Sequence, residues 1–164
     1  MDTNVVMTAE GAHPDAPPRC VAESARALRE IMRTGVVCVD SGRRILQEYQ
    51  RQFDQKRQPG AGAKFVRWVL DGKWVEDRVH RVDITPLGDD EFAELPSPED
   101  GTVYDPSDRK FLAVAAAHPG KPPVLQALDS KWWGWQSSLA KLGIQIEFLC
   151  PAEIERKYKE KHGK

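Results

Sequence analysis

The chain has 164 residues with 30% charged and 40% hydrophobic side chains, and its formal net charge is −1. This length suits one domain with a sizeable core. The charge balance excludes a globally basic protein, and neither a membrane-length apolar run nor a signal peptide is recognisable, so we expect no association with a membrane.

The charges are unevenly distributed along the chain. Residues 19–81 contain 14 Lys/Arg and 8 Asp/Glu, whereas residues 82–108 contain 9 Asp/Glu and no Lys/Arg. The first region could face an anionic polymer, and the second could repel it or bind a basic partner.

Cysteine and histidine are scattered through the sequence. The odd number of cysteines, without the spacing of metal ligands, is typical of reduced thiols and predicts a cytoplasmic location. The histidines form no recognisable ligand pair, so we expect them to be structural or exposed. The residues concerned are Cys20, Cys38, Cys150, His13, His80, His118 and His162.

The first third of the chain predicts a helix, a strand and a second helix. Near the start, Asp2 is expected at the end of a strand that would lie upstream, so either the fold begins abruptly or the true start lies further upstream. An apolar stripe over residues 20–33 predicts a helix. The run VVCV over residues 36–39 closes on Asp40 and is typical of a strand buried on both faces. Residues 43–53 predict the next helix.

The middle of the chain carries weaker signals. Residues 58–64 predict a turn that leads into a helix over residues 65–70. Residues 79–85 alternate and predict a strand or an extended connection. The acidic, proline-bearing residues 87–101 predict a surface loop.

The stretch YDPSDRKFLAVAAA, residues 104–117, predicts a buried helix with acids at its start. Asp108 there is either a helix cap or a metal-binding acid. Residues 123–128 then predict a strand that ends at Asp129. A helix over residues 132–142, a strand over 144–149 and a charged helix over 151–161 complete the chain.

The alternation of strands and helices predicts an α/β fold with a mostly parallel sheet and helices on both faces. Acids that follow such strands meet at one edge of the sheet, where they can bind a hard divalent cation. Asp2, Asp40 and Asp129 have this setting, and Asp108 begins a helix nearby. Glu48 lies beside the apolar face of its helix, although it could instead be an exposed partner of Arg44 or Arg51.

These acids and their contexts resemble the PIN-domain nuclease superfamily, the fold of VapC-type toxins. MDTNV resembles the opening strand-end Asp of that family, ILQEY its second acidic motif, DRKFLAVA its third and ALDSKW its fourth. The resemblance covers most of residues 1–150 as one PIN-like nuclease domain, and residues 151–164 form a charged C-terminal tail or short helix. Two departures are the missing strand before Asp2 and Lys131, which stands where many relatives carry a further acid.

The resemblance implies a three-layer α/β/α fold and a Mg²⁺- or Mn²⁺-dependent phosphodiesterase that acts on nucleic acid, on RNA rather than DNA. It also implies a toxin-like component, an antitoxin-like protein partner and a homodimer. The implied catalytic and metal-binding residues are Asp2, Glu48, Asp108 and Asp129. Asn4 would support a ligand or contact a phosphate, with Asp40 and Asp105 as lesser candidates, and the proposed nucleic-acid-binding residues are Arg43, Arg44 and Arg51.

Two other interpretations stay open at this point. A phosphatase of the haloacid-dehalogenase type also begins with a strand-end Asp, but it requires a second Asp two residues later, where this chain has Asn4. A catalytically degenerate PIN-like domain that binds nucleic acid or protein is favoured by Lys131 and by the missing first strand. The arginines of residues 43–51 could equally be a solvated surface.

Overall fold

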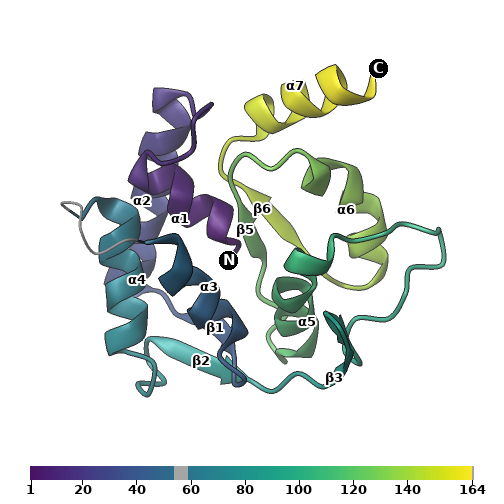
Figure 1. The fold of residues 1–164 in the computed structure, drawn as a ribbon, viewed down its shortest axis with the longest axis horizontal. Coiled ribbons are helices and arrows are strands. Elements are labelled where there is room, and N and C mark those ends of the chain that lie inside the picture. Colours follow the sequence, from purple (N-terminus) through teal and green to yellow (C-terminus); the bar gives the residue numbers. More distant parts are fainter. Residues whose placement is uncertain (54–58, 164) are drawn as a thin grey trace.

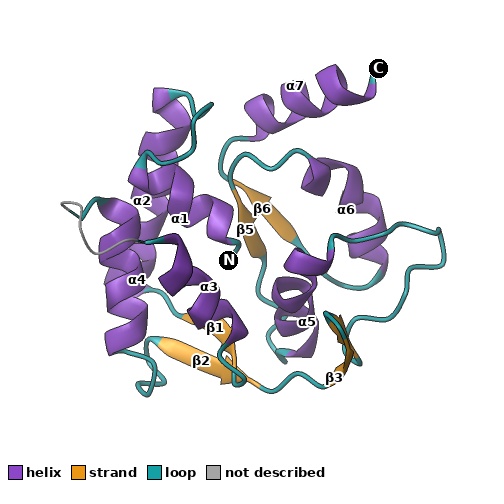
Figure 2. Ribbon diagram, viewed as in Figure 1, coloured by secondary structure: helices purple, strands orange, loops and turns teal. Residues whose placement is uncertain are grey.

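The structure is a computed structural model that describes residues 1–53 and 59–163. These residues form a mixed α/β fold in which helices surround short strands (Figure 1; Figure 2). The helices are α1 (Thr3–Glu10), α2 (Pro18–Thr34), α3 (Arg44–Gln52), α4 (Ala61–Asp71), the 3₁₀ turn η1 (Pro106–Asp108), α5 (Arg109–Ala117), α6 (Lys131–Lys141) and α7 (Pro151–His162). The strands are β1 (Val37–Asp40), β2 (Val79–Val82), β3 (Pro86–Gly88), β4 (Glu91–Phe92), β5 (Val124–Gln126) and β6 (Ile146–Phe148).

Within the described residues the strands associate only in pairs. β1 pairs with β2 and β5 pairs with β6, both in parallel, whereas β3 and β4 are antiparallel. The alternation of helices with parallel strands is therefore confirmed. Among the described residues no backbone ladder joins the β1–β2 pair to the β5–β6 pair, so the mixed α/β class is confirmed and the three-layer arrangement around one central sheet stays a prediction.

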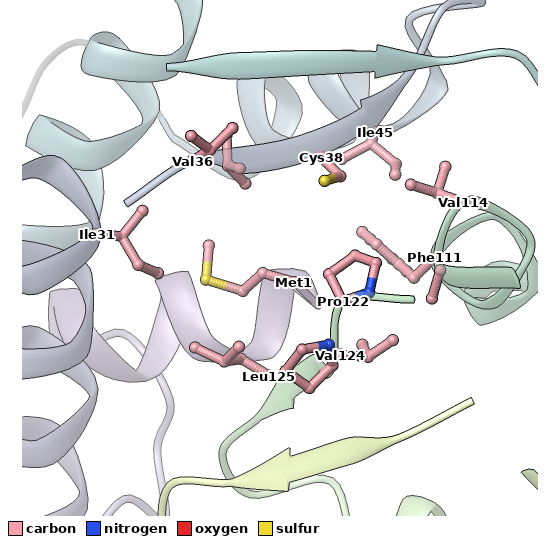
Figure 3. A pocket seen from close by; sticks show the side chains of 13 residues that line it. Met1, Ile31, Val36, Cys38, Ile45, Phe111, Val114, Pro122, Val124 and Leu125 are labelled. Carbon is pink, nitrogen blue, oxygen red and sulfur yellow. The ribbon is translucent and has the colours of Figure 1, made fainter. Parts of the chain in front are cut away.

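The two parallel pairs face each other across an apolar cavity of about 60 Å³. Figure 3 shows Cys38 of β1 on one side, Val124 and Leu125 of β5 on the other, and the side chain of Met1 between them. The N–H of Asp2 then donates to the carbonyl of Leu125 at 3.2 Å. The first two residues thus fill part of the space between the pairs and attach α1 to β5.

Asp2 begins a helix directly. Its Oδ1 accepts a hydrogen bond from the Asn4 N–H at 3.1 Å, which is the usual contact of an N-cap carboxylate. Val5 and Val6 in the following turns are fully buried. The strand expected before Asp2 would lie upstream of Met1, and the described residues contain no such strand.

Most of the other predicted elements are confirmed within a few residues. The helices expected over residues 20–33, 43–53, 132–142 and 151–161 are α2, α3, α6 and α7, and the strands expected over 36–39, 79–85, 123–128 and 144–149 are β1, β2, β5 and β6. The loop expected over residues 87–101 is partly wrong, because β3 and β4 form a short antiparallel pair in which Phe92 is buried.

Helix α4 begins earlier than the sequence predicted. The expected turn over residues 58–64 reaches Gln58, which lies outside the described residues, but α4 already begins at Ala61. Glu10 of α1 accepts hydrogen bonds from the Gly60 and Ala63 N–H groups at 2.9 and 2.8 Å and so caps α4 from another helix. A Cβ on Gly62 would lie 2.3 Å from the Val6 carbonyl, so this close approach of α1 to α4 requires glycine.

A disulfide joins Cys20 of α2 to Cys150 at the start of α7, with Cα atoms 5.7 Å apart. The prediction that all three cysteines are reduced is therefore wrong for this pair, and the cytoplasmic location loses that argument. Cys38 is a free thiol. Ile154 of α7 is fully buried, so the C-terminal helix packs onto the rest of the fold. No helix in the described part of the chain is long and apolar enough to cross a membrane.

Candidate active site

Asp2 is a buried acid with both oxygens engaged. It is 5% exposed, and besides capping α1 it accepts a hydrogen bond from Nε2 of Gln126, a fully buried residue of β5. Burial raises the pKa of the Asp2 carboxyl, and the negative charges of Asp129 and Glu48 raise it further, while its hydrogen bonds oppose the shift. The sequence signals did not identify Gln126, because a glutamine in a short apolar strand has no local signature.

Asp108 lies at the start of α5 but does not cap it. Asp105 caps the preceding turn η1 instead, through the Ser107 N–H at 3.0 Å. The Asp108 side chain is 8% exposed, and its Oδ2 has no hydrogen-bond partner among the described residues. Burial, followed by the negative charge of Asp2, raises the pKa of Asp108 to about 7. Asp108 therefore makes no cap hydrogen bond to α5, and its role as a site acid stays a prediction.

Lys131 brings three acids together. Its Nζ lies 2.8 Å from Oδ2 of Asp105, 2.8 Å from Oδ2 of Asp108 and 3.3 Å from Oδ2 of Asp129. The contact with Asp108 is an ion pair whose angles are not those of a hydrogen bond. The ammonium group lowers the pKa of Asp105 to about 2. Burial alone would lower the pKa of Lys131, but the hydrogen bond to Asp105 and the negative charges of Asp108 and Asp129 raise it.

Glu48 projects from α3 toward the same region. Its Oε1 accepts a hydrogen bond from the Thr3 hydroxyl of α1, and its Oε2 lies 2.5 Å from Nζ of Lys110 in α5. The alternative pairing with Arg44 or Arg51 is not the one formed. Because its charge also acts on Asp2, Glu48 belongs to the acidic cluster.

The cluster therefore combines carboxylates that are distant in the sequence. α1, α3, α5 and the loop after β5 meet near the centre of the molecule (Figure 1). Lys110 pairs with Glu48, and Lys131 pairs with Asp105, Asp108 and Asp129. With Asp2 these are five acids and two lysines, an excess of three negative charges if all are ionised. Among the described residues, no three of these carboxylates bring their oxygens within 4.8 Å of one another.

Asn4 and Asp40 serve neighbouring backbone groups. Oδ1 of Asn4 accepts from the Leu128 N–H at 2.7 Å, which attaches α1 to the loop that carries Asp129. Asp40 is 1% exposed, and its oxygens accept from the Arg44 and Ile45 N–H groups at 2.9 and 2.8 Å. Asp40 thus caps α3 through both carboxylate oxygens.

The predicted nucleic-acid-binding arginines differ in their surroundings. Arg43 and Arg51 are exposed. Arg44 lies 3.7 Å from the Asp40 carboxylate and 5.6 Å from the ring centroid of Phe92, so it is partly engaged within the fold. Arg43 and Arg51 are therefore the better candidates for contact with an anionic polymer.

The sequence indicated no relation among the histidines, but the structure brings two of them together. His80 and His118 lie side by side, with Nδ1 of His80 3.1 Å from Nε2 of His118. They come from β2 and from the residue after α5, so only the fold brings them together.

Comparisons with protein-family models, with curated proteins and with solved structures found no match to this chain.

Proposed function

We propose that the chain is a Mg²⁺- or Mn²⁺-dependent phosphodiesterase of the PIN-like type that cleaves nucleic acid, preferably RNA. The observation that carries this proposal is the convergence of Asp2, Glu48, Asp108 and Asp129 from four separate segments into one partly buried cluster. Buried acids at this density are costly unless they serve a cation or a reaction. An antitoxin-like partner and a homodimer stay predictions from the sequence resemblance.

The residues present suit a hard divalent cation. The site offers carboxylate oxygens, which Mg²⁺ and Mn²⁺ prefer, and Asp108 has a buried oxygen without a hydrogen-bond partner among the described residues. Asp108 and Asp129 would hold the ion directly or through water, with Asp2 and Glu48 beside them. A bound divalent ion supplies an activated water and neutralises charge on the phosphate.

The protein's own groups prepare this chemistry in three ways. Gln126 and the Asn4 N–H fix the orientation of the Asp2 carboxylate. Lys110 and Thr3 fix Glu48. Because the Asp108 pKa is about 7, this carboxyl holds a proton near neutral pH in the absence of a cation, and it can release that proton when positive charge arrives.

A nuclease assay tests the proposal. The parent, Asp108→Asn and a control, Asp89→Asn at an exposed acid of the β3–β4 turn, are incubated with mixed RNA and with single-stranded DNA, in Mn²⁺ and in EDTA. We expect the parent to cleave RNA only with metal, and the control to cleave it at the parent rate. Asp108→Asn should lose at least ~10²-fold of the cleavage rate, as for other groups that act electrostatically at a transition state. Equal cleavage in EDTA, or unchanged cleavage by Asp108→Asn, contradicts the proposal.

One observation favours a second candidate, a catalytically degenerate PIN-like domain that binds nucleic acid or protein. The Lys131 ammonium group lies among three carboxylates, where a cation would bind. In that case the parent shows no cleavage above the Asp108→Asn background with any metal, although binding to RNA in a gel-shift experiment persists.

A further inference from the structure

A second group of metal-ligating side chains lies apart from the acidic cluster. Cys38 of β1 and His80 of β2 are directly paired in the parallel register, so their side chains project from the same face of the strand pair. His118 follows the last residue of α5, the helix that packs against β1. The three residues come from distant parts of the sequence and are all half-buried.

The spacing of these side chains approaches that of a tetrahedral metal site. One sulfur and two imidazole nitrogens lie within 4.8 Å of one another, and the two nitrogens are 3.1 Å apart. Metal–nitrogen bonds of ~2.0–2.1 Å at tetrahedral angles place neighbouring nitrogens about 3.3 Å apart, and a sulfur ligand about 3.5 Å from each. The two nitrogens face each other in a hydrogen bond, so binding an ion requires the imidazole rings to rotate until both nitrogens point at it.

We propose that Cys38, His80 and His118 bind a transition-metal ion of the Zn²⁺ class. A thiolate with two imidazoles is a ligand set for borderline-soft cations, whereas Mg²⁺ and Mn²⁺ prefer the oxygen ligands of the acidic cluster. The two sites are thus chemically distinct, and this proposal does not depend on the nuclease function.

The surroundings give the ion a route to the site and leave one coordination position free. His80 and His118 line an open cleft of about 550 Å³, together with Trp74, Arg81 and Asp83. On the opposite side, Cys38 borders the apolar cavity that contains Met1 (Figure 3). An ion bound by three protein ligands would therefore present its fourth position to the cleft, where water or another molecule can bind.

One hydrogen bond changes when metal binds. The Gly120 N–H donates to Nδ1 of His118 at 3.0 Å, so in the neutral imidazole the proton is on Nε2, which donates to Nδ1 of His80. Coordination through Nε2 transfers the imidazole proton to Nδ1 and displaces the Gly120 N–H. The backbone amide of Gly120 is therefore an internal reporter of metal binding at this site.

Cobalt(II) replaces zinc in such sites and absorbs light when a thiolate binds it, so it serves as the probe. The parent, Cys38→Ser, His80→Gln and Asp108→Asn are purified without reductant, so that Cys20 and Cys150 stay paired, and are titrated with Co²⁺. We expect an intense near-ultraviolet thiolate-to-cobalt band that saturates at one ion per chain in the parent and in Asp108→Asn. The band should be absent in Cys38→Ser.

Competition with Zn²⁺ gives the affinities. Loss of a residue that only supports a ligand costs 10–100-fold in metal affinity, so loss of a ligand in Cys38→Ser or His80→Gln should weaken binding by at least ~10²-fold. The Gly120 amide resonance should shift with Zn²⁺ in the parent but not in His80→Gln. The proposal is overturned if saturating Co²⁺ gives no thiolate band in the parent, or if Cys38→Ser retains it. Should Cys38→Ser fail to fold, parent-like affinity in a folded His80→Gln overturns it equally.

Discussion

Replacement of Lys131 by methionine tests whether its ammonium group stands in for a cation in the acidic cluster. Methionine keeps much of the side-chain length but leaves Asp105, Asp108 and Asp129 without their shared positive charge. We expect the metal-free variant to be less stable than the parent, because repulsion between the remaining carboxylates is then uncompensated.

The size of the effect follows from the exposure of the lysine. Removal of one partner from a buried ion pair costs about 3–5 kcal/mol. The Lys131 side chain is 33% exposed, so water screens part of the repulsion. We therefore expect a loss of about 1–3 kcal/mol. For a domain of this size about 2–4 °C of melting temperature accompanies each kcal/mol, so the metal-free variant should melt roughly 2–12 °C lower.

Divalent metal should offset this loss of stability. A cation at ~100 times its dissociation constant adds about 2.7 kcal/mol, or roughly 5–10 °C, and it binds more tightly where no lysine competes for the carboxylates. Saturating Mn²⁺ should thus raise the melting temperature of Lys131→Met by more than that of the parent. Lys141→Met is the matched control, because Lys141 is on the same helix and pairs with Asp100 at the surface.

Thermal melts of the three proteins in EDTA and in millimolar Mn²⁺ provide the comparison. If Lys131→Met and Lys141→Met have the same melting temperature in EDTA, repulsion between the acids does not measurably lower the stability of the fold. If Mn²⁺ stabilises all three equally, Lys131 does not occupy a cation position.

Two further predictions concern pH and nucleic-acid binding. The pKa of Asp108 rises from 3.8 in a free carboxyl to about 7 in the fold, so between these values the folded protein binds a proton that the unfolded chain does not. Its stability in EDTA should therefore fall as pH rises from about 4 to about 7. Asp108→Asn should flatten this slope in melts across that range, and an unchanged slope would assign it to other groups. Arg43→Glu with Arg51→Glu should weaken RNA binding and reduce its salt dependence, with little change in stability because both are exposed; parent affinity and parent salt slope would show that these arginines are ordinary solvated surface.

Local sequence signals predicted the segments that carry the acids. The short apolar run before Asp129 predicted a strand, and the DPSD turn predicted the start of a helix. The structure contains both, as β5 and as η1 before α5, because such elements depend mainly on neighbouring residues. The order of strands and helices then placed Asp108 and Asp129 in the same region, where Lys131 now joins them. Asp40 has the same strand-end signal but serves as a helix cap, because the chain turns at once into α3 and its N–H groups reach the carboxylate first.

Contacts between distant segments could not be predicted from one sequence. Glu10 caps α4 from another helix, and Cys20 is 130 residues from Cys150. The pairing of His80 with His118 depends in the same way on how α5 packs against the β1–β2 pair. Nothing within the local sequence of any of these residues indicates its partner, because each pairing is set by how distant segments pack. The expectation of reduced thiols at Cys20 and Cys150 was wrong for this reason.

The two lysines decide how strongly the acidic cluster requires a metal ion. Lys110 neutralises Glu48, and Lys131 is shared by three carboxylates, so neither lysine compensates Asp2 directly. With a proton on Asp108 and the other four acids ionised, the five acids and two lysines would have an excess of two negative charges, which one divalent cation would neutralise. Burial raises the pKa of Asp2 as well, so the excess shrinks if Asp2 also holds a proton. A lysine that compensated every acid would leave the cluster neutral without a metal ion. The metal dependence of the melts described above therefore separates the proposed enzyme from the degenerate domain.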